Sequence, residues 1–355
     1  MDTSPTPLSH LMIELSNKGK GLGEDASPLF LVSENKQMYV VGAFDGMGGS
    51  GSTIYTNKKN SEKHTGAYLA SRAVRDVVEC FFQGRVAQNH SQITPSDIDL
   101  LKQKIVESLE VTLDLHSYEP SRIKSSMVRV LPTTMAVGQV IFQANQDAGV
   151  FEVLWAGDSR VYFLSSKLGC IQLTKDDLKL NNDPYQNIKN DSPLSNKVCL
   201  DSDFTINHKT HTIPNIHSLL PGLFFAATDG CFQFFKTPMH FEELFLRTLQ
   251  SSDSMMVWQK LIADDLQQRA GDDCTMPLVC LTKGTFDFSA FKAAFSKRQS
   301  YLHSNIIVPI TELEDTVASC NEAARQADKT LESLYEATWN VYKNNYYFFF
   351  NPPEQ

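Results

Sequence analysis

The sequence lacks a CxxC cysteine pair, a long apolar run and a surplus of positive charge. These features are typical of zinc-binding or redox proteins, of membrane-spanning proteins and of nucleic-acid-binding proteins, respectively. Its seven cysteines are scattered and odd in number, which excludes a disulfide framework and indicates no zinc site. The N-terminus has no basic start followed by an apolar core, so no signal peptide is predicted. We therefore expect a cytoplasmic protein without a membrane span, or one exported by a route that leaves no such signal.

Acidic residues outnumber basic ones by 41 to 32, and the formal net charge is -9. This balance argues against a surface for nucleic acid or anionic membrane, so no nucleic-acid partner is expected. Hydrophobic residues make up 42% of the 355 residues, which is enough for one large globular domain with an appendage or for two domains.

Strand-like and helix-like segments come in blocks, with hairpins and no regular βαβ alternation. Apolar, β-branched runs predict strands at 29–33, 38–44, 133–143, 151–157, 160–165, 170–174, 204–213, 222–228 and 274–282. Helical patterns cover 65–82, 96–116 (with Ser96 as N-cap), 241–250 and 253–269, whereas 52–64 and 84–95 are polar and loop-like. The fold class is therefore α+β, with antiparallel sheets covered by helices in layers.

Residues 285–355 differ from residues 1–284 and are predicted to form a helical C-terminal extension with an aromatic tail. Thr311 and Glu314 predict a capping box at the start of a long helix. One narrow seam of mostly small residues then recurs in steps of four and three, at Leu313, Val317, Cys320, Ala324, Ala327, Leu331, Leu334, Thr338 and Val341. We expect the 311–343 helix to dock on its own domain or on helix 288–297, ahead of self-association or a foreign protein partner.

Carboxylates recur at predicted strand ends, each beside a glycine or a turn. They are Glu24 and Asp25 in GEDA, Asp45 in FDGMGG, Asp158 in GDSR, Asp229 in TDG, and Asp272 and Asp273 in DDCT. Such positions can converge at one rim of a sheet, where carboxylates without matching Lys or Arg need cations. Oxygen ligands favour magnesium or manganese over zinc, and two such ions can clamp a phosphoryl group.

Taken in order, the motifs GEDA, FDGMGG, TTM, GDSR, TDG and DDCT resemble the metal-dependent protein serine/threonine phosphatases, the protein phosphatase 2C or PPM family, in its bacterial-type branch. The resemblance covers roughly residues 15 to 283. It implies a layered sandwich of two antiparallel β-sheets flanked by helices, which agrees with the strand pattern, and makes residues 1–284 the catalytic domain.

The resemblance also implies roles for individual residues. Asp45 would bridge two divalent metals, manganese or magnesium, the Gly46 carbonyl would bind one of them, and Asp229 and Asp272 would complete the protein ligands. Asp158 would join Asp229 around a weaker third metal.

Three further acidic residues would support these ligands. Glu24 would act through metal-bound water, Asp25 would be structural or lie behind the ligands, and Asp273 stands where the family usually has Asn. Gln233 stands where some members place another acidic residue.

Two departures from the family pattern bear on catalysis. The family's phosphate-binding Arg is Lys20 here, which can attract substrate phosphate as a point charge but cannot form a bidentate fork. A plain surface lysine is the alternative interpretation of Lys20. Met47 stands where some members carry His, so no general acid is available at that residue.

Three neighbouring features are interpreted more simply. His64 is expected to be a solvated loop histidine, and Arg160 to pair with a carboxylate for structural reasons. The polar segment 176–198 is predicted to be a flap that meets the substrate protein.

The expected activity is hydrolysis of phosphoserine and phosphothreonine in proteins by a water that bridges two divalent metals, with Lys20 and the metals neutralising phosphoryl charge. A phosphoprotein is the expected substrate partner. Two alternatives stay open: a catalytically weak phosphatase-like binding module acting through its C-terminal helix, and a small-molecule phosphomonoesterase.

Overall fold

The computed structural model describes residues 10–16, 22–34, 37–88, 92–118, 128–142, 148–179, 183–189 and 192–346. The chain divides into two compact units, Met1–Gln299 and Ser300–Gln355. The domain boundary predicted between residues 284 and 285 lies earlier in the chain and stays a prediction.

Two five-stranded antiparallel sheets form the centre of the first unit. One sheet has the order β1 (His10–Leu15), β13 (Cys274–Leu281), β12 (Gly222–Ala227), β9 (Arg160–Ser165) and β10 (Gly169–Gln172). The other has the order β11 (Asn207–Pro214), β8 (Ala148–Ala156), β7 (Met135–Phe142), β3 (Met38–Ala43) and β2 (Leu29–Val32). The predicted fold class, two antiparallel sheets flanked by helices, is confirmed.

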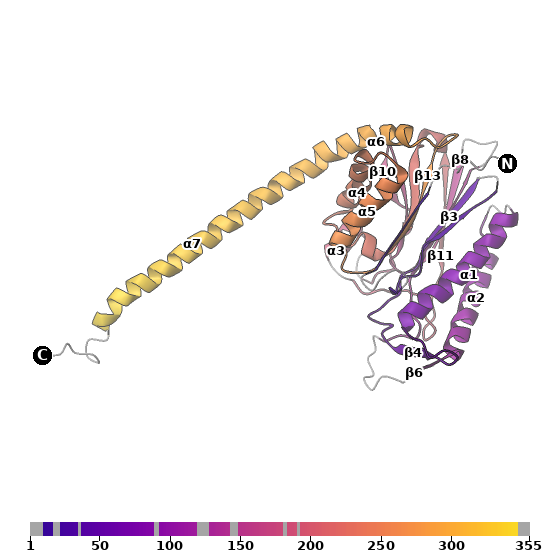
Figure 1. Ribbon diagram of the computed structural model, residues 1–355, viewed down its shortest axis with the longest axis horizontal. Coiled ribbons are helices and arrows are strands. Elements are labelled where there is room, and N and C mark those ends of the chain that lie inside the picture. The colour runs from indigo at the N-terminus through magenta and orange to yellow at the C-terminus, as the bar shows by residue number, and fades with distance from the viewer. Residues whose placement is uncertain are drawn as a thin grey trace. The chain divides into compact units, whose positions relative to one another are not determined.

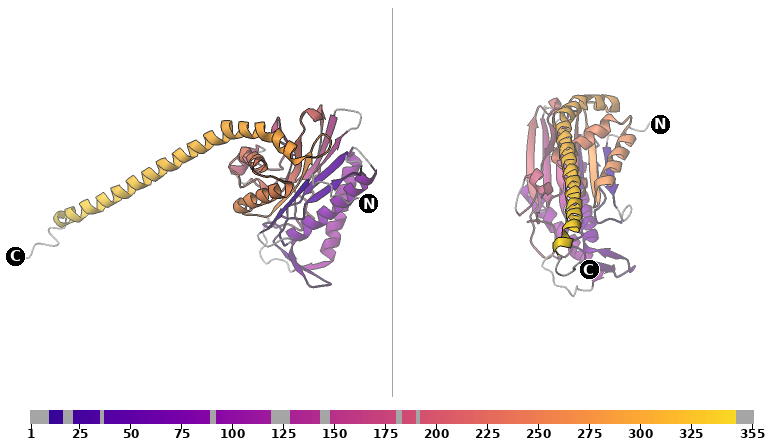
Figure 2. Two further views of the ribbon diagram at one scale, coloured as in Figure 1. Left: turned by 45° about the horizontal axis from the view of Figure 1, so that its top comes forward. Right: turned by 90° about the vertical axis from the view of Figure 1, so that its left-hand side faces the viewer.

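Helices cover both outer faces of the paired sheets, with α1 and α2 on one side and α4 and α5 on the other (Figures 1 and 2). The helices of this unit are α1 (Gly66–Gln88), α2 (Pro95–Asp114), α3 (Pro184–Lys189), α4 (Pro238–Gln250), α5 (Met255–Arg269) and α6 (Phe288–Leu302), which extends into the second unit, with a 3₁₀ turn η1 (Ile216–Ser218). Within this unit the Arg298 guanidinium of α6 binds the Glu242 carboxylate of α4, Nε to Oε1, at 2.6 Å.

Three layers of buried apolar side chains hold these elements together. One lies between the sheets, where Phe151 of β8 meets Phe163 of β9 and Phe224 of β12. A second lies between the second sheet and α1 and α2, where Val74 and Leu101 are fully buried. The third lies between the first sheet and α4, where Phe225 of β12 meets Phe241 and Phe245. Each sheet therefore has one face against its partner sheet and one against helices, which explains why most strands read as continuous apolar runs.

Local capping sequences set where the helices begin. Thr94, and not the predicted Ser96, is the N-cap of α2: its hydroxyl accepts from the Asp97 amide while the Asp97 carboxylate accepts from the Thr94 amide. Pro95 then takes the first helical position, where its missing N–H costs nothing. Thr237 and Ser254 cap α4 and α5 in the same way.

The segment 52–64, predicted to be a polar loop, instead carries strands of a third, small sheet. Its order is β5 (Lys63–Thr65), β4 (Ile54–Asn57) and β6 (His116–Tyr118). The strands have only three or four residues, too few for a sequence pattern to separate them from a loop. Strand β1 was not predicted either.

The second unit is helical throughout its described residues, 300–346. A π-helical turn, η3 (His303–Ile307), leads from α6 into α7 (Val308–Tyr346), so the predicted capping box at Thr311 and Glu314 is wrong. The helix is already formed upstream, and the Thr311 hydroxyl donates to the Ile307 carbonyl at 3.0 Å. No helix in the described part of the chain is long and apolar enough to cross a bilayer. The aromatic tail after residue 346 lies outside the described residues.

Candidate active site

The antiparallel register of the two sheets brings the predicted carboxylates to one edge. Ala227 at the end of β12 pairs with Arg160 at the start of β9, and Met135 at the start of β7 pairs with Ala156 at the end of β8. The acidic residues lie within two residues of strand ends: Asp45 after β3, Asp158 after β8, Asp229 after β12 in the 3₁₀ turn η2 (Asp229–Cys231), and Asp272 and Asp273 before β13.

These side chains lie close enough to perturb one another strongly. Burial raises the pKa of Asp45 well above its usual range, and the charges of Asp229, Asp25 and Asp158 raise it further. Burial and then the charge of Asp229 likewise raise the pKa of Asp158, although Arg160 opposes this. A pKa raised by several carboxylates at once is the signature of an acidic cluster without its own counter-charge.

Asp25 is the most central member of the cluster, and only about 6% of it is exposed. Its side chain hydrogen-bonds to that of Asp45 and accepts from the Thr228 hydroxyl at 2.8 Å. Burial raises the pKa of Asp25 to about 7 despite these bonds, and burial followed by the charges of Asp25 and Asp272 raises that of Asp229 to about 7. Burial and the neighbouring carboxylates therefore both favour the protonated form of this cluster.

Main-chain contacts fix the turn that carries Glu24 against the turn that carries Asp45. The Glu24 amide donates to Asp273 Oδ2 at 2.6 Å, and its carbonyl accepts from the Ser71 hydroxyl at 2.6 Å. A Cβ at Gly46 would collide with the Glu24 carbonyl oxygen, so only glycine allows this approach. The glycine after Asp45 is thus explained by packing.

Threonine side chains hold the turn that carries Asp45 and the turn that follows β12. Thr133 Oγ1 and the Thr134 amide both donate to the Asp45 carbonyl oxygen, at 2.6 and 2.9 Å. Thr228 Oγ1, besides donating to Asp25, accepts from the Thr275 amide at 3.0 Å, which ties the ends of β12 and β13 together. Sequence reasoning missed Thr228, because a threonine before TDG gives no signal until its partner is known.

Arg160 pairs with Asp176, which confirms the prediction that it serves a carboxylate. The pair is bidentate, Nε to Oδ1 at 2.8 Å and Nη2 to Oδ2 at 2.6 Å, and both side chains are buried. The guanidinium also lies 4.0 Å from the Phe232 ring centroid. Because two of its nitrogens, Nε and Nη2, bind Asp176, Arg160 neutralises the charge of the Asp45 cluster only in part.

The predicted flap 176–198 is anchored at its start. Asp177 Oδ2 accepts from the Gly157 amide at 3.1 Å and from Asn196 Nδ2 at 2.7 Å. Isolated bridges join Leu178 to Leu194 and Val198 to Thr133. The segment therefore begins and ends beside the acidic cluster, while its contact with a substrate stays a prediction.

The remaining predicted residues fall into different places. Glu24 is half-buried and accepts from Thr65 Oγ1 at 2.8 Å, and Asp272 is exposed at the rim. Lys20 lies outside the described residues. His64 is not in a solvated loop: it belongs to β5 and its ring stacks on Tyr68 at 4.1 Å.

The donor set fits hard divalent cations, because it consists of carboxylates and a main-chain carbonyl. Among the described residues, no three His, Cys, Asp or Glu side chains already meet in a coordinating arrangement. The backbone therefore gathers the carboxylates at one edge, and the described side chains form no preassembled set of ligands there.

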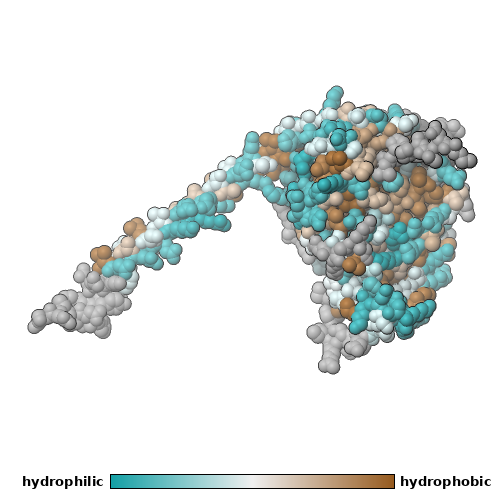
Figure 3. All heavy atoms as spheres, in the orientation of Figure 1, coloured by the Kyte–Doolittle hydropathy of each residue, from teal (hydrophilic) through white to brown (hydrophobic). Residues whose placement is uncertain are grey.

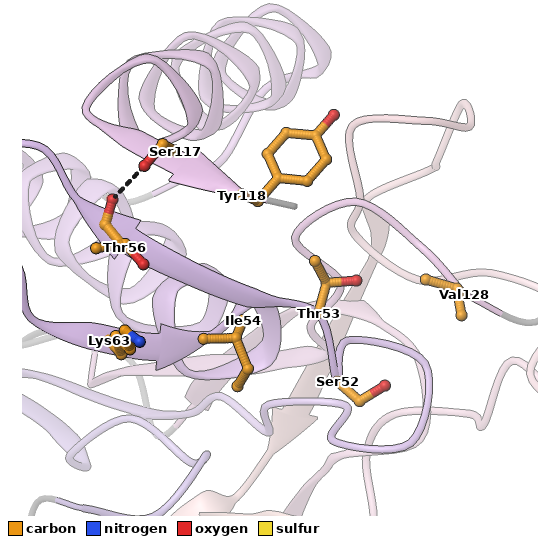
Figure 4. Close-up of a pocket in the computed structure, with 8 residues that line it drawn as sticks. All are labelled: Ser52, Thr53, Ile54, Thr56, Lys63, Ser117, Tyr118 and Val128. Atoms are coloured by element: carbon orange, nitrogen blue, oxygen red, sulfur yellow. Dashed lines mark hydrogen bonds between the residues drawn. The ribbon is translucent and has the colours of Figure 1, made fainter. Parts of the chain in front are cut away.

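A pocket of about 870 Å³ opens beside the glycine loop and the small third sheet (Figure 4). Its lining is largely hydroxylic, with the lysine and the tyrosine contributed by β5 and β6: Ser52, Thr53, Ile54, Thr56, Lys63, Ser117, Tyr118 and Val128. None of the clustered carboxylates lines it, so it adjoins the candidate site without being part of it.

Neither a protein-family profile nor a curated protein sequence matches the chain. Solved structures do match its fold. The Mycobacterium tuberculosis serine/threonine phosphatase PstP is 13% identical with a TM-score of 0.50, over 77% of this chain and 98% of that one. Staphylococcus aureus Stp1, also a serine/threonine phosphatase, is 13% identical with a TM-score of 0.50, over 80% and 100%.

A Caenorhabditis elegans sex-determining protein is similar as well, at 13% identity and a TM-score of 0.52, over 82% of this chain and 68% of that one. The chain therefore has the fold of the metal-dependent protein serine/threonine phosphatases, as the order of the motifs predicted.

Proposed function

We propose that this chain is a metal-dependent phosphatase that hydrolyses phosphoserine and phosphothreonine in proteins. The observation that carries the proposal is the acidic cluster of Asp25, Asp45, Asp158 and Asp229, which lies at the sheet edge without a full counter-charge. A fold maintained for packing alone has no reason to keep this arrangement, since uncompensated buried carboxylates cost stability.

Two divalent cations, manganese or magnesium, would supply the positive charge that ionises water and neutralises phosphoryl oxygens. Asp45, Asp229, Asp272 and the Gly46 carbonyl would hold them, and Asp158 with Asp229 would hold a weaker third. The hydrogen bonds from Thr133 and Thr134 to the Asp45 carbonyl, which hold the Asp45 turn, support this assignment.

The supporting residues have distinct parts in this proposal. Asp25, which hydrogen-bonds to Asp45, would orient the Asp45 carboxylate, and the contact of the Glu24 amide with Asp273 would fix the turn that carries Glu24. Lys20 would attract the substrate phosphate as a point charge. The Met47 side chain has no proton that it can donate, so the departing alkoxide would take its proton from water.

The test is hydrolysis of a phosphothreonine peptide with manganese, with magnesium and with EDTA. Asp229→Asn should lose activity by on the order of 10²–10³-fold, the effect of removing one preorganised charge-stabilising group. Asp264→Asn, the same change at an exposed site on α5, is the matched control and should keep it.

Two other outcomes decide between the alternatives. Folded protein that binds manganese but hydrolyses nothing would favour a phosphatase-like binding module, for which the long helix α7 is the supporting feature. Turnover of metabolite phosphates far above that of phosphopeptides would favour a small-molecule phosphomonoesterase.

A further inference from the structure

The long helix α7 presents one apolar seam that no other described residue of its own unit covers. Five of its large apolar side chains, Leu313, Val317, Leu331, Leu334 and Val341, are 44–77% exposed. Hydrophobic colours follow one side of this helix and hydrophilic colours the other (Figure 3). Spacings of four and three hold without a break from Leu313 to Val341, which is the a/d repeat of a coiled coil.

Charge is excluded from the seam and nearly excluded from its borders. Of nine charged residues between 312 and 341, none lies in the seam and seven lie on the outer face: Glu312, Asp315, Glu322, Arg325, Lys329, Glu332 and Glu336. Only Glu314 and Asp328 take positions that flank the seam. A second copy of this acidic helix can therefore approach along the seam without facing like charges.

We propose that α7 pairs with α7 of a second copy of this chain as an antiparallel two-stranded coiled coil. This inference concerns assembly and does not depend on the proposed phosphatase activity. Antiparallel pairing matches an a residue with a d residue of the second copy.

The layers that antiparallel pairing creates are complementary in size. Val317 meets Leu334 of the second copy, Cys320 meets Leu331, and two Ala324–Ala327 layers lie at the centre, where the helices come closest. Parallel pairing would instead stack Cys320, Ala324 and Ala327 each on itself, which leaves three thin layers in a row beside two Leu layers. Uneven layers of that kind leave unfilled space, and unfilled space costs stability.

The flanking residues and helix dipoles agree with the antiparallel arrangement. Asp328 then faces Asn321 of the second copy, and Glu314 faces Tyr335, so neither acidic flank meets another. The two helix dipoles also oppose each other. An interface of this type is self-complementary and closes with two copies.

A site on its own first unit is a poorer match for the seam. The seam is straight and about 42 Å long at 1.5 Å per residue. A compact unit of 299 residues is only about 50 Å across, so its curved surface touches part of such a line. Among the described residues of that unit, the exposed large apolar side chains lie on several different elements, for example Leu100 on α2 and Met256 on α5.

The first experiment measures the mass of the full chain by light scattering and sedimentation between about 1 and 50 μM. We expect twice the monomer mass of 39.8 kDa. Leu331→Glu places a carboxylate in the seam and should raise the dissociation constant by roughly 100-fold or more. Ser333→Glu adds the same charge two residues away on the outer face and should leave the dimer intact.

A monomer at 50 μM, or a dimer that tolerates Leu331→Glu, would overturn the proposal. The first result would leave the seam to this chain's own first unit or to another protein, and the second would place the dimer interface elsewhere. Circular dichroism of each variant shows whether the helix is retained, so that loss of pairing is not confused with unfolding.

Cross-linking tests the orientation. On oxidation with copper phenanthroline, Leu331→Cys should form a disulfide-linked dimer through Cys320 of the second copy, and adding Cys320→Ser should abolish it. The wild-type chain should not cross-link through Cys320. Wild-type cross-linking through that residue, or a Leu331→Cys dimer that survives Cys320→Ser, would show parallel pairing and overturn the antiparallel arrangement.

Discussion

The Arg160–Asp176 pair and the Asp45 cluster both bury carboxylates at neighbouring turns, but only the pair carries its own counter-charge. Asp176 receives two guanidinium hydrogen bonds, whereas Asp45 has Asp25, Asp158 and Asp229 around it. The first arrangement is complete within the chain. The second is stabilised only by protons or by cations from outside, which separates a structural carboxylate from a candidate ligand.

The largest stability effect should come from breaking the complete pair. Asp176→Asn leaves the Arg160 charge buried and unpaired, and should lower the free energy of unfolding by about 3–5 kcal/mol. Urea unfolding measures it, with Asp264→Asn as the exposed control. If the free energy of unfolding fell by no more than about 0.5 kcal/mol, as for an ordinary surface change, Asp176 would not be the essential counter-charge of Arg160.

Removing one carboxylate from the Asp45 cluster should not lower stability, in contrast to Asp176→Asn, and should strongly lower activity. Asp45→Asn removes one repelling charge, so the metal-free protein at pH 7.5 should be as stable as the wild type or more stable. Phosphopeptide hydrolysis should fall on the order of 10²–10³-fold. Unfolding and activity are measured on the same preparation, and a marked destabilisation without metal would show that Asp45 is structural.

The pH dependence of the metal-free protein should distinguish the two regions next. The pKa of Asp229 is raised to about 7 in the folded protein, against an ordinary value of 3.8. The folded state therefore binds more protons than the unfolded state between about pH 4 and 7, and stability rises as pH falls through 7. Between pH 8 and 6 one such group contributes on the order of 1 kcal/mol.

Thermal unfolding at pH 8 and pH 6, with EDTA and with manganese, measures this effect. Bound manganese replaces the proton, so the gain on acidification should disappear or reverse when manganese is present. A metal-free melting temperature that falls between pH 8 and 6 would contradict the assignment of an uncompensated cluster.

An effect of similar size should come from the threonine that ties the cluster to the sheet. Thr228→Val removes the hydrogen bond to Asp25 and the acceptor of the Thr275 amide, and should cost about 1–2 kcal/mol. Asp25 also loses a bond that lowers its pKa, so the stability gain on acidification should begin at higher pH. An unchanged pH profile would mean that Thr228 serves only the sheet.

Most of the fold was predictable because its strands are long and buried on both faces. Runs such as 222–228 and 274–282 carry enough apolar residues to be recognised alone, and they became β12 and β13. The short strands β4, β5 and β6 were not, because three or four residues in polar surroundings carry no usable period. The start of α2 was misplaced by two residues, since Ser96 and Thr94 are both good caps and only the Asp97 bond selects between them.

The sequence by itself determined which residues have the chemistry for the candidate site, and in which order. The glycines and aspartates at strand ends are close in sequence to the strands that carry them, so their motifs can be recognised from the sequence. The seam of α7 can be recognised for the same reason, because its residue spacing depends only on the geometry of one helix.

Only the tertiary structure decided which carboxylates are compensated. Asp25, interpreted from the sequence as a supporting residue, lies at the centre of the cluster beside Asp45 and Thr228, although its role stays a prediction. Asp176 looked like part of a flap and is the partner of Arg160. Charge compensation depends on distances between segments far apart in the chain, which are set by how the two sheets pack and not by any local pattern.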